Sequence, residues 1–246
     1  MSVLRLKENM KEHRTLQPLP VIQLTNNKGD TMKKILVIGA HYDDAELGVG
    51  GSMAKWIREG KEVFKLTLSD NETNFEKRNI RVNAKESQDE SSKACKILGI
   101  KEISDFPLQS CTNVIFDKNQ MQLIESFVLD YKIDTLIMHN MSDIQQDHVH
   151  AATIAYVAGR YCDTLLAYQS NKYILPKDYY PRYFIDITKT IELKKEALNC
   201  YSYAHNRYRQ LFEMTIKQNR VWGYQCSMNS EEIFAEAFSI LKYTER

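Results

Sequence analysis

The sequence predicts an α/β domain in which helices cover both faces of a mainly parallel β-sheet. Short apolar runs have the length of strands, and they lie at residues 34–39, 62–68, 134–138, 164–168 and 182–187. These runs are nearly unbroken, which is typical of strands buried on both faces. Helical stretches alternate with them, and that alternation favours a parallel sheet.

The first predicted strand, residues 33–40, leads into the most informative stretch of the chain. His41, Asp43, Asp44 and Glu46 follow it directly. Three glycines come next, Gly48, Gly50 and Gly51, and apolar residues then recur with helical spacing at Met53, Ala54, Trp56 and Ile57. The segment therefore predicts a strand, a tight loop and a helix. Ligand sites in open α/β sheets lie beyond the carboxyl ends of strands, where this loop must fall.

Two interpretations of the adjacent carboxylates compete. Acidic residues in a first helical turn cap free amides and complement the helix dipole. An imidazole three residues before Asp44 favours a metal site instead, because histidine and aspartate are both zinc ligands. We adopt the metal interpretation for His41 and Asp44.

A third ligand is expected from another strand end, since catalytic zinc sites have three protein ligands and an open position. The run at 134–138 is followed by a polar loop from His139 and then by Asp147 and His148. His148 directly follows Asp147 and is the predicted ligand. His150 lies two residues further along a helix and points elsewhere. His139 follows the strand immediately and could reach the pocket.

These residues resemble a known family. The patterns Ala40-His41-x-Asp43-Asp44-x-Glu46 and Asp147-His148 each follow a buried strand. They are similar to the motifs of the LmbE-like or PIG-L family of zinc-dependent N-deacetylases. The resemblance runs from about Lys33 through the C-terminal part, where Ala235-Glu236-Ala237-Phe238 also looks like a family feature, as does Leu98-Gly99 earlier in the chain. It implies a Rossmann-like sheet.

The resemblance also implies a role for each residue of the two motifs. His41, Asp44 and His148 would hold one Zn²⁺ per chain, and Asp43 would be the general base. A zinc ion lowers the pKa of its water from about 15.7 to about 7, so a carboxylate suffices to take the remaining proton. Asp43 could then pass that proton to the leaving amine. Asp147 would orient groups of the site.

The chain departs from the family pattern at three places. Tyr42 stands where the family usually has proline, and Glu46 comes one residue later than the family glutamate. Gln145-Gln146 replaces the histidine and proline of the second motif. Glutamine can donate a hydrogen bond but cannot carry charge. The metal site should therefore persist while the rate, the pH optimum or the acid changes. His139 or His150 could supply an imidazole.

The remaining sequence bounds the molecule. A single deacetylase domain is expected over residues 32–246, with a polar N-terminal arm over residues 1–31. The net charge of +1 gives no field for nucleic acid or membrane. We see no apolar run of 18 residues and no secretory signal pattern. Five scattered cysteines without C-x-x-C spacing predict reduced thiols and a cytoplasmic protein.

The substrate side is expected at the loop of residues 70–74, which follows the strand at 62–68 and should open onto the same sheet edge. Beyond it, Lys77, Arg78 and Arg81 could meet a phosphate or carboxylate of the substrate, the alternative being a solvated helix face. Tyrosines of the C-terminal part could line a sugar pocket or an oligomer interface. The expected partner is a small N-acetylated molecule, and a homo-oligomer is possible.

The leading interpretation is a metal-dependent hydrolase that removes an acetyl group from an amino sugar or sugar conjugate, such as a nucleotide sugar. A non-haem iron enzyme would use the same two histidines and carboxylate, but such enzymes have β-rich scaffolds. A nucleotide-binding module is a third interpretation, yet Gly48-x-Gly50-Gly51 does not fit the G-x-G-x-x-G spacing. A family member with weakened or lost catalysis that binds a ligand is a fourth, and Gln145 is its support.

Overall fold

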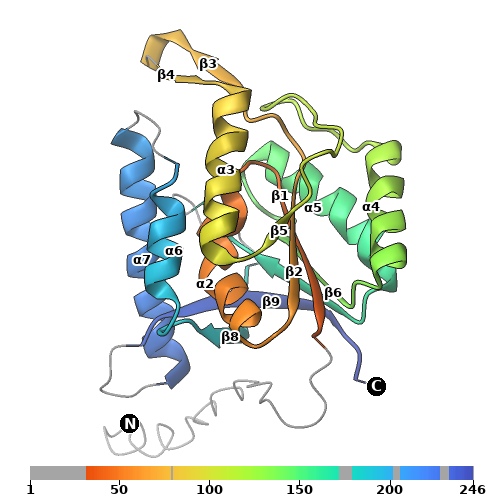
Figure 1. The fold of residues 1–246 in the computed structure, drawn as a ribbon, viewed down its shortest axis with the longest axis vertical. Helices are drawn as coiled ribbons and strands as arrows, with labels where there is room; N and C mark the ends of the chain where they lie inside the picture. Colours follow the sequence, from red (N-terminus) through yellow and green to blue (C-terminus); the bar gives the residue numbers. More distant parts are fainter. Residues whose placement is uncertain (1–31, 79, 172–178, 202–205, 228–232, 246) are drawn as a thin grey trace, which may run out of the picture.

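The computed structural model describes residues 32–78, 80–171, 179–201, 206–227 and 233–245. Its centre is a seven-stranded sheet in the order β5-β2-β1-β6-β7-β9-β8 (Figure 1). The strands are β1 (Lys34–Gly39), β2 (Glu62–Thr67), β5 (Lys101–Glu102), β6 (Thr135–His139), β7 (Thr164–Tyr168), β8 (Tyr183–Asp186) and β9 (Ala235–Tyr243). β5, β2, β1, β6 and β7 pair in parallel, whereas β9 is antiparallel to both β7 and β8. The mainly parallel sheet predicted from the sequence is confirmed.

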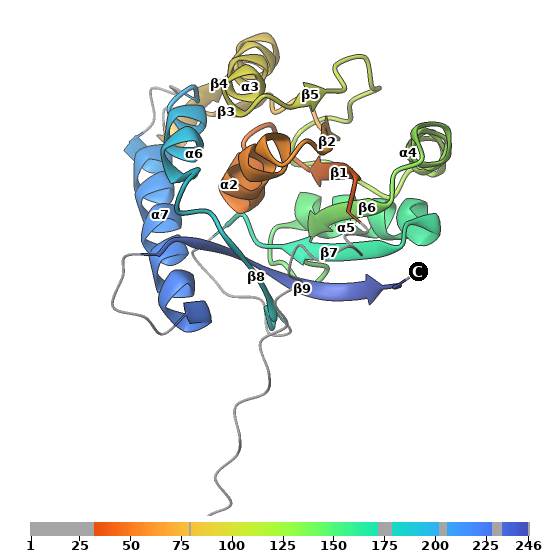
Figure 2. The same ribbon diagram turned by 60° about the horizontal axis from the view of Figure 1, so that its bottom comes forward.

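Helices cover the sheet on two sides (Figure 2). One side carries α2 (Asp44–Arg58), α3 (Ala84–Leu98), α6 (Ile191–Leu198) and α7 (Asn206–Ser227), and the other carries α4 (Lys118–Tyr131) and α5 (Gln146–Ala158). β1 shows why both sides are needed, because Ile35 and Val37 pack into one core cluster while Leu36 and Ile38 pack into the other. Side chains alternate across a strand, so an unbroken apolar run supplies both layers.

β9 is a long strand that the sequence pattern did not predict. It lies between β7 and β8, and its Glu236 is fully buried beside Lys194, whose Nζ donates to Glu236 Oε1 over 2.5 Å. A carboxylate inside the strand breaks the apolar run that identifies the other strands. The antiparallel end of the sheet therefore escaped the prediction.

The order of the strands along the chain reverses direction between β1 and β6. The chain continues from β1 outward to β2 and β5 on one side, and from β6 outward to β7 on the other. β1 and β6 are direct neighbours, with Ile35 opposite Thr135. Their carboxyl ends therefore flank a topological switch point, where open α/β sheets bind ligands.

The predicted order of strand, tight loop and helix is confirmed, with the loop confined to residues 40–43, and the glycines that follow lie inside α2. α2 begins at Asp44, so Gly48 and Gly51 are interior helical residues. A Cβ at Gly48 would lie 2.1 Å from Cδ2 of Tyr168, and one at Gly51 would lie 2.6 Å from Cδ1 of Ile187. Glycine at these positions costs about 1 kcal/mol of helix propensity each. It allows the helix to approach the sheet closely.

A separate two-stranded sheet follows β2, formed by β3 (Thr73–Phe75) and β4 (Ile80–Val82) and drawn at the top of Figure 1. We call this unit the hairpin. Residues 76–78 between its strands form a 3-10 turn, η1 (Glu76–Arg78). The solvated helix face considered for Lys77, Arg78 and Arg81 is therefore wrong, because Lys77 and Arg78 belong to this turn and Arg81 belongs to β4.

Two further expectations concern the N-terminal arm and membrane-spanning segments. The predicted N-terminal arm, residues 1–31, lies outside the described residues. Within the described ranges, no helix has the length and apolar character needed to cross a membrane.

Candidate active site

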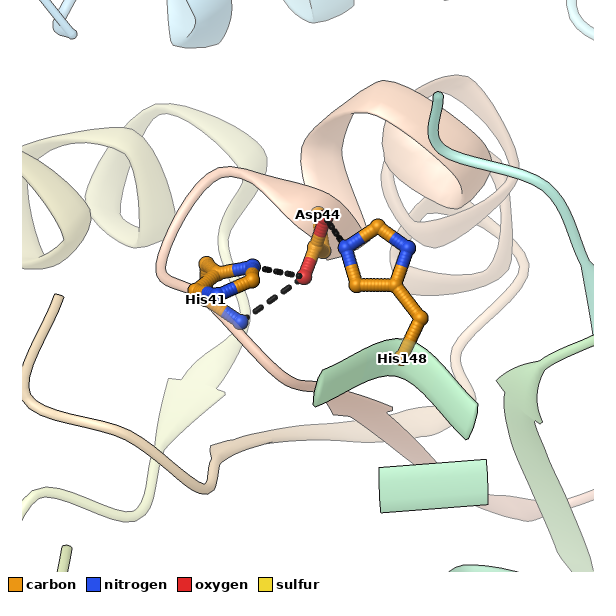
Figure 3. A group of neighbouring side chains, drawn as sticks. All are labelled: His41, Asp44 and His148. Atoms are coloured by element: carbon orange, nitrogen blue, oxygen red, sulfur yellow. Dashed lines mark hydrogen bonds and ion pairs between the residues drawn. The ribbon is translucent and has the colours of Figure 1, made fainter. Parts of the chain in front are cut away.

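The three predicted metal ligands lie together at the carboxyl ends of β1 and β6. His41 follows β1, Asp44 opens α2, and His148 lies in the first turn of α5, with Asp44 between the two imidazoles (Figure 3). The distance from His41 Nδ1 to Asp44 Oδ2 is 3.3 Å, and that from His148 Nε2 to Asp44 Oδ1 is also 3.3 Å. Ligand atoms bound to zinc at about 2.0–2.1 Å in a tetrahedron lie about 3.3 Å apart. The donor set therefore fits a divalent zinc-like ion.

His148 is held from behind by Asp143. Its Nδ1 lies 3.2 Å from Asp143 Oδ2, and Asn171 donates a hydrogen bond to the other oxygen of Asp143. Burial lowers the pKa of His148, but the negative charge of Asp44 and the hydrogen bond with Asp143 outweigh it and raise that pKa to about 9. The sequence analysis missed Asp143. The sequence feature that could have identified Asp143 is an acidic residue in the loop after β6, five residues before His148.

His41 is held in the same way by Asp147. Its Nε2 lies 3.1 Å from Asp147 Oδ2, and the amides of Thr112 and Val114 donate to the same carboxylate over 2.7 and 3.1 Å. Burial lowers the pKa of His41, whereas the hydrogen bonds with Asp147 and Asp44 raise it well above its usual value. Asp147 thus occupies the place that an orienting carboxylate needs.

Asp43 is the N-cap residue of α2, but its side chain makes no capping hydrogen bond. The residue instead lines the same cavity as the ligand set and is 6% exposed. Burial, followed by the negative charge of Asp44, raises the pKa of Asp43 to about 7. Burial also raises the pKa of Asp44, but the charge of His148 outweighs it and holds that pKa well below its usual range. The two neighbouring carboxyls are thereby suited to different tasks.

His139 lies behind the ligand set, outside the cavity. It is fully buried at the end of β6, and its Nε2 is 3.1 Å from both the Ala40 amide nitrogen and Asp44 Oδ2. Its ring stacks on that of His148 at 4.0 Å between centroids. Burial and the positive charge of His148 lower the pKa of His139 to about 4. His150 does not line the cavity either.

Gln145 occupies the rim of the cavity. Its Oε1 accepts the amide of His148 over 3.0 Å, which caps the start of α5. The same side chain lines the cavity, where Nε2 is the donor that it retains. The replacement of an imidazole by glutamine therefore keeps a cap and a neutral donor.

Glu46 does not line the cavity and instead anchors the loop beneath it. Lys65 Nζ donates to Glu46 Oε1 over 2.6 Å and to the Tyr42 carbonyl over 2.5 Å, and all three residues are buried. Tyr201 also donates to the Tyr42 carbonyl, over 2.7 Å. The sequence analysis missed Lys65, because the lysine stands within an apolar strand. Hydrogen bonds thus fix the backbone at Tyr42.

The cavity has a volume of about 380 Å³, and three further parts of the fold line it beside the ligand set. The predicted substrate loop contributes Asn71 and Thr73, the hairpin contributes further residues, and the first half of α7 closes the side. Arg81 is exposed on the opposite face of β4 and does not line the cavity, so its substrate contact stays a prediction. The side chain of Arg78 lies outside the described part of the structure.

Comparison with known proteins supplies one family match and several similar structures. Residues 36–158 match the PIG-L family model, which is described as GlcNAc-PI de-N-acetylase. The structure of N,N'-diacetylchitobiose deacetylase from Pyrococcus horikoshii is similar, with a TM-score of 0.67, 17% identity, and coverage of 85% of this chain and 84% of that one.

Two further structures have the same fold at 21% identity. The 4-carboxy-2-hydroxymuconate hydratase GalB from Pseudomonas putida KT2440 has a TM-score of 0.69 and covers 87% of this chain and 99% of its own. The conserved protein TT1542 from Thermus thermophilus has a TM-score of 0.67, with coverage of 84% and 94%. At such identities, these similarities establish the fold alone.

Proposed function

The chain belongs to the PIG-L family, whose model spans residues 36–158 of its 246, and we propose that it is a metal-dependent N-deacetylase. Its proposed substrate is an N-acetylated amino sugar or sugar conjugate, and its proposed setting is the cytoplasm. The family assignment supports the reaction, and the arrangement of side chains around Asp44 supports the need for a metal.

His41, Asp44 and His148 would hold one zinc ion per chain, since their ligand atoms lie within 4.8 Å of one another. When bound, the ion supplies Lewis-acid activation of the attacking water and of the amide carbonyl. Asp143 and Asp147 fix the two imidazoles from the far side of each ring, which presets the ligand directions.

Asp43 moves the proton in this proposal. Its carboxylate takes a proton from water as the oxygen forms a bond to the acetyl carbon. Gln145 Nε2 donates a hydrogen bond to the oxyanion that develops. The same Asp43 then returns the proton to the amine nitrogen as the C–N bond breaks, so that acetate and a free amine leave. A pKa of about 7 suits a group that first accepts and then donates a proton near neutral pH.

The observation that carries the proposal is the position of Asp43. The residue stands at a helix N-cap, where its carboxylate would ordinarily cap the helix, yet it makes no capping bond and lines the cavity beside the ligand set. Burial and the charge of Asp44 raise the pKa of Asp43, and this arrangement disfavours a charged carboxylate whose role is only structural.

The test combines metal analysis with product analysis on the purified protein. We expect one zinc per chain and release of acetate from members of a panel of N-acetyl sugars and nucleotide sugars. Asp43→Asn should lower kcat at least about 100-fold while metal content stays unchanged, because general acid–base catalysis contributes about 10²–10⁴-fold. Asp130→Asn, on the exposed surface of α4, is the matched control.

The possible outcomes separate the alternatives. Full activity in Asp43→Asn would remove this residue from the mechanism. Stoichiometric zinc without acetate from any substrate would favour a ligand-binding family member, and iron in place of zinc would reopen the oxygenase interpretation.

A further inference from the structure

The cavity has two unlike walls. The wall formed by the strand ends is polar and contains the ligand set, Asp43 and Gln145. The hairpin and α7 add apolar side chains to the lining, namely Phe75, Ile80, Leu211 and Met214, next to the polar Gln210. We call these four apolar residues the apolar wall.

The hairpin presents one of its two faces to the cavity. Thr73 pairs with Val82 and Phe75 pairs with Ile80 across the strands, and all four line the cavity. Asn74 and Arg81 pair with each other between them. Because successive side chains of a strand point to opposite faces, Asn74 and Arg81 belong to the other face, and both are exposed.

The apolar face of the hairpin has no part in the main core. Phe75 and Ile80 belong to none of the core clusters formed by the described residues, and the hairpin is not hydrogen-bonded into the seven-stranded sheet. Phe75 remains 45% exposed. Its ring therefore contributes an accessible apolar surface at the mouth of the cavity.

α7 supplies the other two members of the apolar wall. Leu211 and Met214 are three residues apart and so share one face of the helix. Met214 is also 45% exposed. Methionine is a flexible and polarisable side chain that adapts to apolar groups of different shape.

We propose that the substrate carries an apolar group, an alkyl chain or a ring, which packs between the hairpin and α7 while its N-acyl group meets Asp43. This inference rests on the proposed function. A purely hydrophilic N-acetyl sugar would leave Phe75 and Met214 in contact with water, whereas an apolar group would remove both side chains from water. The apolar group belongs either to the acyl part or to the amine part of the substrate, and the chemistry of the wall is the same for both.

Two substrate series distinguish these sources. In the first, N-acetylglucosamine carries O-alkyl chains of increasing length. In the second, glucosamine carries N-acyl chains from acetyl to hexanoyl. We expect kcat/KM to rise up to about fourfold for each of the first few methylenes in one series, which corresponds to about 0.8 kcal/mol per buried methylene. The rising series identifies the part of the substrate that meets the apolar wall.

Substitutions locate the effect. Phe75→Ala and Met214→Ala should each lower kcat/KM for the longest substrate of the rising series at least about fivefold more than they lower kcat/KM for N-acetylglucosamine, because only the long substrate reaches both side chains. Asn74→Ala and Arg81→Ala, on the other face of the same strands, are the matched controls and should change neither value. Met214→Gln replaces an apolar cavity-lining side chain of α7 by a polar one of similar size, and it should lower the same kcat/KM without altering the hairpin.

A binding measurement tests the apolar wall without requiring catalysis. Calorimetry with zinc-loaded Asp43→Asn and the octyl glycoside of N-acetylglucosamine, or N-octanoylglucosamine, should show tighter binding than with N-acetylglucosamine, and Phe75→Ala should abolish the difference. Deacetylation without any dependence on chain length, together with equal binding, would overturn the inference and leave the proposed function standing. Absence of deacetylation with chain-dependent binding would instead overturn the function and retain the apolar site.

Discussion

Each imidazole of the candidate metal centre has its own carboxylate behind it. Asp143 contacts Nδ1 of His148, and Asp147 contacts Nε2 of His41, so both rings face Asp44 with their remaining nitrogen. Such partners fix the orientation and tautomer of a ligand and raise its basicity. The two carboxylates lie on different elements from Asp44, and the pocket is therefore preset from three directions.

Replacement of Asp143 tests this arrangement at the residue that sequence analysis missed. Asp143→Asn should weaken zinc binding about 10- to 100-fold, because His148 loses its charged partner. Competition with a chromophoric chelator would measure the change. Asp105→Asn, on an exposed loop, should leave affinity unaltered. Equal zinc affinity in Asp143→Asn and the wild type would assign Asp143 a purely structural contact.

Some residues of the candidate metal centre could be predicted from the sequence, and others could not. His41, Asp44 and His148 follow buried strands, and parallel strands end at one edge, so their proximity could be inferred without coordinates. Asp143 and Lys65 could not be found in this way. Their importance depends on which nitrogen or carbonyl they meet, and that follows from ring directions and burial rather than from spacing.

At the scale of elements, the glycines of α2 determine how closely the helix approaches the sheet. Gly48→Ala should destabilise the protein by about 1–3 kcal/mol, the usual cost of overpacking, despite the higher helix propensity of alanine. The reason is the Tyr168 ring, which lies 2.1 Å from the position of the new Cβ. Urea unfolding would measure the loss.

Gly50→Ala is the comparison in the same helix. Its Cβ would lie 3.2 Å from Cγ of Lys194, a tight contact that a shift of a few tenths of an ångström relieves. A smaller loss is expected there. Equal free energies of unfolding for Gly48→Ala and Gly50→Ala would contradict the close-approach explanation.

Strands with a clear apolar sequence pattern could be predicted, whereas strands whose burial depends on tertiary contacts could not. The five apolar runs were all strands, to within one or two residues at their ends. The hairpin was missed because its strands are three residues long and one of its faces is polar. β9 was missed because Glu236 is neutralised by Lys194, a partner that sequence does not reveal.

At the scale of the whole molecule, each of the two core layers flanking the sheet contains a buried cysteine whose reactivity can be used to measure unfolding of that layer. Cys95 packs in the core cluster beneath α2 and α3, and Cys162 packs in the cluster beneath α4 and α5. Burial raises the pKa of each thiol to about 12. The thiolate is the reactive form of cysteine, so an ordinary thiol with a pKa of about 8.5 becomes more reactive between pH 7 and 9. The thiols of Cys95 and Cys162 remain protonated throughout that range.

Alkylation kinetics would therefore report opening of the fold. We expect Cys95 and Cys162 to react with iodoacetamide at pH 8 only through unfolding, with the same free energy and the same urea dependence, if residues 32–246 form one cooperative domain. Mass spectrometry locates the modified thiols, and the partly exposed Cys200 serves as the reference. Different opening energies for the two thiols would show that the layers unfold separately.

The separation of His41 and His148 along the chain has a consequence for folding as well as for chemistry. The two residues are more than one hundred positions apart, yet both contact Asp44. In polymer terms, an ion shared by them is a crosslink that closes a loop containing β2, β5 and β6. Because long loops lose the most entropy on closure, the ion would bind the unfolded chain far more weakly than the folded one. Metal availability would then set how long the folded chain survives, in addition to whether it can act.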